Sequence, residues 1–246
     1  MDVVYIVGNG SKWNNNELRY SLRSIEKHGK NIGRVFLVGD DPKFLSDEVT
    51  YLYCYDKYGP CFAHKNIEYK IQYAISTGQL PEHFLIASDD QFYIQDVDLD
   101  NYPVYYKNRE IPYEVPEGHK PGSYWYSLLE TRKLLLRRGL PIYQTNPHMY
   151  KHFDVQLYKD NIQLFNEAYR LPHGGEVSLL MGNLMIANGV EPQRINDCKV
   201  FQYNTQEELD RKLNDRHVFS ISDSAIPCGI GKYLAALFPD KSRYEK

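Results

Sequence analysis

The stretch "HFLIASDDQFYI", residues 83–94, places two adjacent aspartates directly after a short apolar run. An apolar run of about four to eight residues that ends in polar residues is typical of a buried strand. Asp89 and Asp90 therefore stand at the carboxyl end of a predicted strand. Sheets of parallel strands bind their ligands just beyond these carboxyl ends, so the two aspartates mark a candidate site.

Upstream of this stretch, strand-like and helix-like segments alternate. The helix-like segments carry apolar residues on one face, as Leu18, Leu22 and Ile25 do. Such alternation is typical of right-handed crossovers in a mostly parallel sheet. The chain is therefore predicted to be α/β, with a Rossmann-like sheet flanked by helices. The predicted strands are residues 3–8, 34–40, 49–55 and 83–88, and the predicted helices are residues 16–29 and 66–78.

The second half of the chain is less regular. Residues 101–125 are rich in Pro, Tyr and Gly and are predicted to form loops with short strands. No change in composition marks a linker. The chain is therefore predicted to be one domain, residues 1–246, in which a helical and irregular half, residues 101–246, completes the site of residues 1–100. Helices are predicted over residues 123–139, 154–169, 176–189 and 232–238.

Composition and charge restrict the class of protein. The chain has 246 residues, 42% of them hydrophobic, which is enough to bury a sizeable core. A net charge of -3 argues against a strongly basic nucleic-acid coat. The cysteines, Cys54, Cys61, Cys198 and Cys228, form no C-x-x-C pair, and no apolar run reaches the roughly 18 residues of a membrane span. These features predict a reduced, cytoplasmic protein without a transmembrane segment, for which any membrane partner would have to be met peripherally.

Paired aspartates at a strand end suit a hard cation. Mg²⁺ and Mn²⁺ prefer carboxylate oxygens and often bind through one or two of them together with substrate phosphates. Asp89 and Asp90 are thus enough to dock a metal-bound nucleotide. The competing interpretation makes them turn residues that accept hydrogen bonds from nearby backbone N–H groups.

Several segments resemble a known group of enzymes. The segment "ELRYSLRSI" (17–25) followed by "FLIASDDQFYI" (84–94) resembles regions of the Stealth family of sugar-phosphate transferases. The chain is more similar still to small phage- and bacteria-borne proteins of GT-A glycosyltransferase type. Further segments shared with that group are Asn66 with Lys70, His152 in "HFDVQLYKD", Gly182 with Asn183, Asp197 with Lys199, and "FPDKSRYE" (238–245).

The resemblance implies a GT-A-like fold and a cytoplasmic glycosyltransferase, in the host cytoplasm if a phage encodes it. The enzyme would use a nucleotide-sugar donor, taken to be UDP-linked, bound by residues 1–100, with Mn²⁺ or Mg²⁺. It implies that Asp89, Asp90 and His152 hold the cation. The chain departs from the group at Asp154, where Pro is common, and in "SDD", which replaces the D-x-D of many metal-dependent glycosyltransferases.

The donor is expected to contact the first loop and several basic side chains. In "GNGSKW" (8–13), the glycines allow close approach of the backbone, and the polar side chains can bind a base or ribose. Arginine and lysine suit phosphate. The alternatives are a plain turn and solvated helix faces. The residues expected to bind the donor are Gly8, Asn9, Gly10, Ser11, Arg19, Arg23, Asn66, Lys70 and Lys199.

The second half offers a rival metal ligand and a candidate base. His148 lies four residues before His152, and an even spacing would place both on one side of a strand. Glu176 opens a predicted helix and is a candidate general base for deprotonating an acceptor hydroxyl. The alternative for Glu176 is an acidic residue that the helix dipole favours in the first turn. Asp90 is the second candidate catalytic residue.

The acceptor is expected to be a hydroxyl of a glycan or of a hydroxymethylated base in phage DNA. Arg132, Lys133, Arg137 and Arg138, near the aromatic residues 124–126, would suit a nucleic-acid backbone or an ordinary solvated helix face. Two other functions stay open, which are Stealth-like transfer of the sugar with its phosphate and a non-catalytic nucleotide- or glycan-binding module. The sequence specifies neither the sugar, the nucleobase, the stereochemistry nor the oligomeric state.

Overall fold

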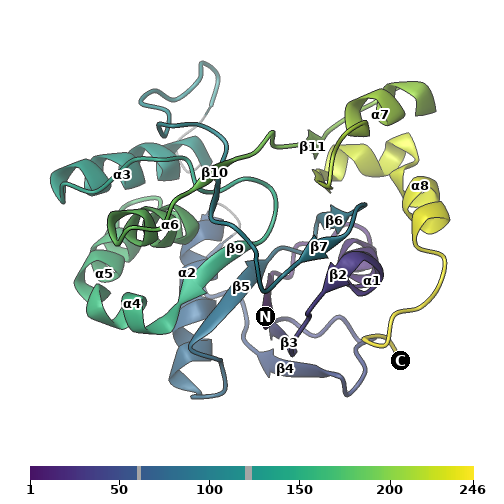
Figure 1. Cartoon of the computed structure of the whole chain (residues 1–246), viewed down its shortest axis with the longest axis horizontal. Coiled ribbons are helices and arrows are strands. Elements are labelled where there is room, and N and C mark those ends of the chain that lie inside the picture. The colour runs from purple at the N-terminus through teal and green to yellow at the C-terminus, as the bar shows by residue number, and fades with distance from the viewer. Residues whose placement is uncertain (60–61, 120–123) are drawn as a thin grey trace.

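The computed structural model describes residues 1–59, 62–119 and 124–246. Its main sheet has the strand order β4-β3-β1-β5-β9. Figure 1 labels β3, β4, β5 and β9 of this sheet. The first four strands in the order are mutually parallel, and β9 runs antiparallel to β5. The predicted mostly parallel α/β sheet is therefore confirmed. The strands are β1 (Val3–Val7), β3 (Val35–Gly39), β4 (Val49–Tyr53), β5 (His83–Ala87) and β9 (Lys151–Asp154).

Helices cover both faces of this sheet. Helix α1 (Asn16–His28) packs its buried face, which includes Leu18 and Leu22, against Tyr5 and other residues of one sheet face. Helix α2 (Ala63–Ser76) and helix α6 (Val177–Ala187) share the core of the opposite face. Successive strand residues point to opposite faces, so β1 contributes to both cores. Both helices predicted in the first half are confirmed.

The strand order reverses beside β1. From β1 the chain runs outward to β3 and β4, and it then returns to β5 on the other side of β1. Consequently the loops after β1 and β5 leave the sheet side by side and diverge. An open sheet forms its ligand crevice at such a switch point, which is where Asp89 and Asp90 lie.

The second half adds β9 and a layer of helices, namely α3 (Tyr124–Arg137), α4 (Val155–Asp160), α5 (Ile162–Arg170) and α6. The single helix predicted over residues 154–169 is wrong. Asn161 leaves the helical conformation, and its side chain donates to the carbonyl oxygen of Leu157, so the helix divides there. The helix predicted from residue 123 is described from Tyr124, because Ser123 lies outside the described residues.

A small sheet, in the order β11-β12-β6, brings the chain back to the first half. Strand β6 (Gln91–Tyr93) follows the two aspartates directly and pairs with β12 (Val218–Ile221), which pairs with β11 (Lys199–Val200). Around it lie α7 (Gln206–Leu213), the 3₁₀ helix η2 (Asp223–Cys228) and α8 (Ile230–Leu237). Helix α8 begins two residues before and ends one residue before the predicted helix, residues 232–238. Two-residue pairs complete the sheets: β2 (Gly29–Lys30) with β7 (Val97–Asp98), and β8 (Tyr105–Tyr106) with β10 (Gln193–Arg194).

The shared Gly-Asn pair of α6 serves packing. A Cβ at Gly182 would collide with the Thr145 side chain, so only glycine lets the helix approach so closely. Asn183 is fully buried, and its amide bonds the backbone N–H and carbonyl of Tyr143. The pair therefore anchors α6 to the segment before β9.

Among the described residues, Cys54, Cys198 and Cys228 are free thiols. Cys61 lies outside the described residues. None of the described helices has the length and apolar character that a bilayer crossing requires.

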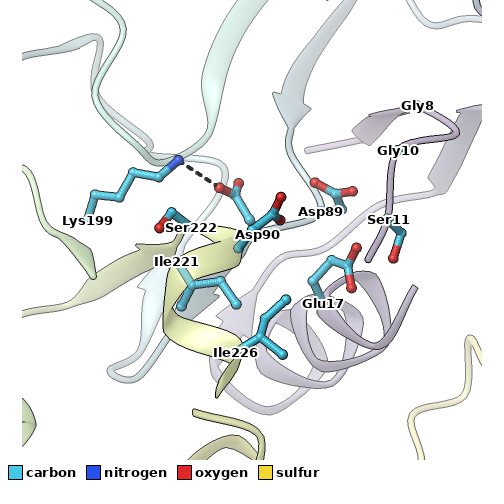
Figure 2. A pocket seen from close by; sticks show the side chains of 11 residues that line it. Gly8, Gly10, Ser11, Glu17, Asp89, Asp90, Lys199, Ile221, Ser222 and Ile226 are labelled. Atoms are coloured by element: carbon cyan, nitrogen blue, oxygen red, sulfur yellow. Dashed lines mark hydrogen bonds and ion pairs between the residues drawn. The ribbon is translucent and has the colours of Figure 1, made fainter. Parts of the chain in front are cut away.

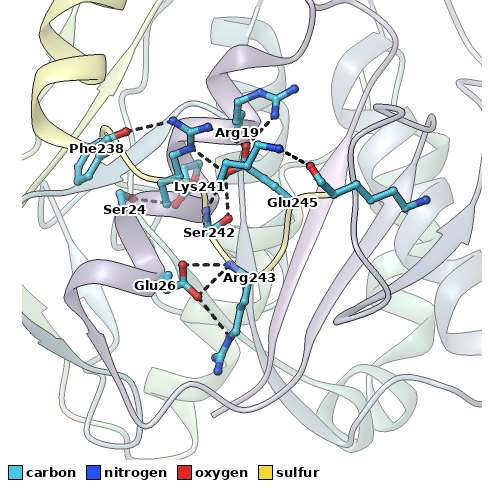
Figure 3. A network of polar contacts seen from close by, with 11 residues as sticks. Arg19, Ser24, Glu26, Phe238, Lys241, Ser242, Arg243 and Glu245 are labelled. Carbon is cyan, nitrogen blue, oxygen red and sulfur yellow. Dashed lines mark hydrogen bonds and ion pairs between the residues drawn. The ribbon is translucent and has the colours of Figure 1, made fainter.

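The C-terminal tail is fastened to α1 by charge (Figure 3). Arg19 donates to Oε2 of Glu245 at 2.7 Å, and Arg23 donates to both carboxylate oxygens of Glu245 at 2.7 and 2.9 Å. The Glu245 side chain is completely buried. The expectation that Arg19 and Arg23 bind phosphate is therefore corrected, because both guanidinium groups are committed to the tail.

This clamp predicts an acid-sensitive contribution to stability. Burial raises the pKa of Glu245, but hydrogen bonds from Arg23, Ser242 and Arg19 outweigh burial and lower the pKa to about 2. Because the folded-state pKa is depressed, the stabilisation is present above about pH 4.5 and is lost as the pH falls through about 2. Glu245→Gln should lower the free energy of unfolding by about 3 kcal/mol at pH 7, with a smaller effect at pH 3.

Urea unfolding at both pH values measures this effect. Glu191→Gln, which alters an exposed loop, is the control. An unchanged stability in Glu245→Gln at pH 7 would contradict the clamp.

Candidate functional site

A cavity of about 420 Å³ lies at the switch point of the main sheet. Its walls come from the loop after β1, the start of α1, the turn after β5, and β11, β12 and η2 (Figure 2). The first half of the chain thus forms one wall, and the returning C-terminal segments form the other. The lining residues are Gly8, Gly10, Ser11, Glu17, Asp89, Asp90, Lys199, Ile221, Ser222, Asp223 and Ile226.

The two aspartates sit in a turn that the small sheet stabilises. The backbone N–H of Ser88 donates to Oε1 of Gln91, and the N–H of Ile221 donates to the carbonyl oxygen of Asp90. Lys199 lies 3.2 Å from Oδ2 of Asp90. Figure 2 marks this contact with a dashed line. The structure therefore brings Asp90 and its neighbour Asp89 together with Lys199, although Asp90 and Lys199 are 109 positions apart in the chain.

Glu17 is a third carboxylate in this cavity, and the sequence reasoning missed it. It stands in the first turn of α1, and Figure 2 shows its side chain directed toward the same space as Asp89. Burial raises the pKa of Asp89 to about 7, and the carboxylates of Asp90 and Glu17 contribute to this rise. The sequence feature that could have identified Glu17 is an acidic residue at the start of a predicted helix, directly after the first loop.

The first loop adopts the predicted close approach to the cavity. Gly8, Gly10 and Ser11 line it, whereas Asn9 does not. The backbone N–H of Asn9 instead donates to Oδ2 of Asp56 at 3.0 Å. The Ser11 hydroxyl oxygen accepts from two backbone N–H groups of its own loop, so its remaining capacity is to donate.

Lys70 and Asn66 hold the loops from behind and do not line the cavity. The Lys70 ammonium is buried, 2.6 Å from Oδ1 of Asp56 and 2.6 Å from the carbonyl oxygen of Val7. The Asn66 amide bonds both the N–H and the carbonyl oxygen of Tyr58. The expectation that these two side chains contact the donor is corrected. They position the loops after β1 and β4.

His152 is also placed away from the aspartates. Its Nε2 atom lies 2.6 Å from the carbonyl oxygen of Tyr102, and its Nδ1 atom lies 3.0 Å from Nε2 of His83. Both ring nitrogens are therefore engaged, and the expected place of His152 in the metal site is corrected. His148 precedes β9, so the two histidines do not share a strand face as predicted.

His148 belongs to a charged group next to Lys199. Its Nδ1 atom lies 2.7 Å from Oδ2 of Asp197, which also pairs with Lys107 at 3.2 Å. Burial lowers the pKa of His148 against the effect of Asp197. Burial alone would raise the pKa of Asp197, but the hydrogen bond and charge of His148, together with Lys107, hold it well below its usual range. The Asp197 carboxylate therefore holds His148 and Lys107 in place next to Lys199.

Glu176 has a structural role at the start of α6, which was the alternative to a catalytic one. It is the N-cap of α6, and its Oε2 atom accepts from the backbone N–H of Leu179 at 2.8 Å. Its own N–H donates to the hydroxyl of Thr131. Glu176 is buried and does not line the cavity, so the expectation of a general base is corrected to a helix cap.

The three arginines of the basic cluster at α3 and just after it have acidic partners. Arg137 and Arg138 both pair with Glu167, at 2.8 and 2.5 Å. Arg132 donates to the carbonyl oxygen of Ile111 and pairs with Glu110 at 3.4 Å. The arginines of this cluster therefore have acidic partners in the structure, and binding of a DNA backbone here stays a prediction.

The cavity suits a hard divalent cation by its donor chemistry. The Oε2 atom of Glu17 is buried without a hydrogen-bond partner among the described residues, in the cavity that Asp89 and Asp90 also line. Within residues 1–59, 62–119 and 124–246, no three His, Cys, Asp or Glu side chains stand in preformed coordination geometry. Mg²⁺ and Mn²⁺ do not require such a cage, because they bind through one or two carboxylates with water and phosphate oxygens.

Comparison of the whole fold places the chain among known architectures. The galactosyltransferase LgtC, in a complex with donor and acceptor sugar analogues, matches it with a TM-score of 0.51 over 98% of this chain and 96% of that one, at 11% identity. An active-site mutant of LgtC matches with a TM-score of 0.50 over 98% of each chain, at 10% identity. The chain has a GT-A fold. By sequence, it matches no protein-family model and no curated protein.

The crowded carboxylates of this GT-A fold predict a stability cost. The raised folded-state pKa of Asp89 means that its destabilising effect is absent below about pH 4 and complete above about pH 7. Asp89→Asn should therefore raise the free energy of unfolding at pH 8 in EDTA by about 2 kcal/mol, after allowance for solvent screening. The gain should vanish at pH 4.

Chemical denaturation at pH 4 and pH 8 tests this expectation, with Asp47→Asn on the exposed surface as the control. Equal stability of wild type and Asp89→Asn at pH 8 would show that the charges do not repel as the geometry requires.

Proposed function

We propose that this protein is a metal-dependent glycosyltransferase that moves a sugar from a nucleotide-sugar donor to a hydroxyl acceptor. The observation that carries the proposal is the acidic cavity with Asp89, Asp90 and Lys199 at the switch point of a GT-A fold. The similarity to LgtC, a galactosyltransferase whose structure holds donor and acceptor sugar analogues, supports this choice.

The carboxylates would receive Mn²⁺ or Mg²⁺ together with the donor diphosphate. When bound, the cation supplies positive charge that stabilises the departing diphosphate. Asp89 and Asp90 line the cavity, and each would offer the cation a carboxylate oxygen. Their proposed role as ligands accounts for two acidic groups being held in a partly buried space where they repel each other.

Lys199 is proposed to act on the same leaving group. Its ammonium lines the cavity and is held 3.2 Å from Asp90, so its position is fixed before the donor arrives. A fixed cation next to developing negative charge stabilises the transition state without reorganisation. Asp90 thereby orients Lys199, and Asp90 also lines the cavity that would hold the donor.

The nucleoside end of the donor would lie against the first loop. Gly8 and Gly10 carry no side chain there, and the Ser11 hydroxyl has a proton to donate. Behind them, the buried Lys70–Asp56 pair fixes the loop through the N–H of Asn9. We propose a UDP-linked donor, because the loop offers backbone groups and a hydroxyl for a small base and its ribose.

For the acceptor, a sugar hydroxyl is favoured over modified DNA. The arginines at and just after α3 that would have met a nucleic-acid backbone are paired with Glu110 and Glu167. The net charge of -3 also disfavours binding to a polyanion. A glycan requires neither feature, since it presents neutral hydroxyl groups.

The first test measures donor cleavage. Purified protein is incubated with a panel of nucleotide sugars and Mn²⁺ or Mg²⁺, and release of the nucleotide is followed. Metal-dependent release from one donor is expected in wild type and in Asp47→Asn. Asp89→Asn with Asp90→Asn should lose at least ~100-fold of this activity, because the leaving group loses its cation.

The outcomes separate the alternatives. A product that retains one donor phosphorus, seen by mass spectrometry, would indicate sugar-phosphate transfer instead. Donor binding without cleavage of any donor, unchanged in the double variant, would leave a non-catalytic binding module.

A second test addresses Lys199. Lys199→Met should lower kcat by about 100-fold with a smaller change in KM, because a fixed charge at the leaving group acts mainly in the transition state. Lys133→Met, on an exposed position of α3, is the matched control. Equal losses in the two variants, or a change in KM alone, would contradict the assigned role.

A further inference from the structure

The described lining of the cavity carries more negative than positive charge, and the unpaired negative charges belong to two particular residues. Four carboxylates line the cavity, those of Glu17, Asp89, Asp90 and Asp223, and one ammonium, that of Lys199. Lys199 pairs with Asp90 at 3.2 Å. At the exposed mouth, Lys12 pairs with Asp223 at 3.0 Å. Glu17 and Asp89 are the two acidic side chains of this lining for which the described residues supply no cationic partner.

Glu17 also has a buried oxygen atom that lacks a partner in the described part of the chain. Its Oε2 atom is buried and has no hydrogen-bond partner among the described residues. A buried carboxylate oxygen without a partner is costly, unless a ligand satisfies it. The surplus of two negative charges equals the charge of one divalent cation.

We propose that Glu17 is a further ligand of the divalent cation beside Asp89 and Asp90, of which Asp90 also holds Lys199. The inference rests on the proposed function and deepens it. It assigns the cation to a carboxylate of α1 as well as to the two neighbouring aspartates of the turn after β5. The histidine expected in the second half is not required, since oxygen donors and substrate phosphates complete the shell.

The position of α1 explains how Glu17 can reach the cation. The loop after β1 is short, and its Trp13 packs against α8, where a Cβ at Gly231 would lie 2.7 Å from the indole ring. The first turn of α1 is thereby fixed at the cavity rim. Further along α1, the clamp of Arg23 and Glu245 fastens the helix to the tail. A helix held at two places presents Glu17 in a defined position.

A purely structural role makes the opposite prediction about stability. An acidic residue in the first turn of a helix interacts favourably with the helix dipole, so removing its charge would destabilise the protein. If Glu17 is a cation ligand, removing its charge relieves the repulsion from Asp89 and stabilises the metal-free protein. The sign of the change therefore separates the two roles.

The experiment titrates the full-length protein with MnCl₂, with and without UDP, and measures unfolding in EDTA. Glu17→Gln is expected to weaken Mn²⁺ binding at least ~10-fold and to raise the stability of the metal-free protein. Glu17→Asp keeps the charge and should recover part of the affinity. Glu207→Gln is the matched control, because Glu207 is an exposed acidic residue in the first turn of α7.

Each outcome decides the matter. Unchanged Mn²⁺ affinity in Glu17→Gln, with a weakened affinity in Asp89→Asn, would overturn the role of Glu17 and leave the proposed function standing. Destabilisation of Glu17→Gln in EDTA, or no recovery in Glu17→Asp, would also overturn it. Absence of Mn²⁺ binding in wild type under both conditions would overturn this role and the metal dependence of the proposed function together.

Discussion

The reversal of strand order beside β1 is the constraint on which the site depends. Because β3 and β5 flank β1 on opposite sides, the loops after β1 and β5 diverge and leave a space between them. The small sheet β11-β12-β6 then closes this space from the far side, since β6 begins where the aspartates end. Residues from both halves of the chain thus meet in one cavity, and Lys199 reaches Asp90 across it.

Much of the charge that resembled ligand chemistry is structural. Lys70 is buried against Asp56 and the carbonyl oxygen of Val7, where it fixes the loop that borders the cavity. Arg19 and Arg23 bind the tail residue Glu245, so that two of the segments carrying the resemblance to small GT-A proteins, near opposite ends of the chain, are partners of each other. Buried ion pairs of this kind hold loops and termini in register, and losing one partner is costly.

In the cavity, by contrast, charged groups of the same sign lie close together, and not all of them are paired within the described part of the chain. Its carboxylates are crowded, and burial and mutual repulsion raise the pKa of Asp89 instead of lowering it. Such an arrangement lowers stability, which the surrounding ion pairs and the two packed faces of the sheet offset. Sites that destabilise the fold locally are common where a ligand later supplies the missing charge.

The sequence by itself determined the α/β class, the first-half strands and helices, and the position of Asp89 and Asp90 at a strand end, because local periodicity encodes each of them. It did not determine which charged residues face the cavity. Glu17 and Arg19 lie two positions apart on one helix, yet one lines the cavity and the other binds the tail. Likewise His152 and Glu176 had suitable chemistry, but Tyr102 and His83 engage the ring nitrogens of His152, and helix capping engages the Glu176 carboxylate. Only the tertiary structure decided these roles, because the partners of these side chains come from distant segments of the chain. A local sequence pattern does not identify such a partner.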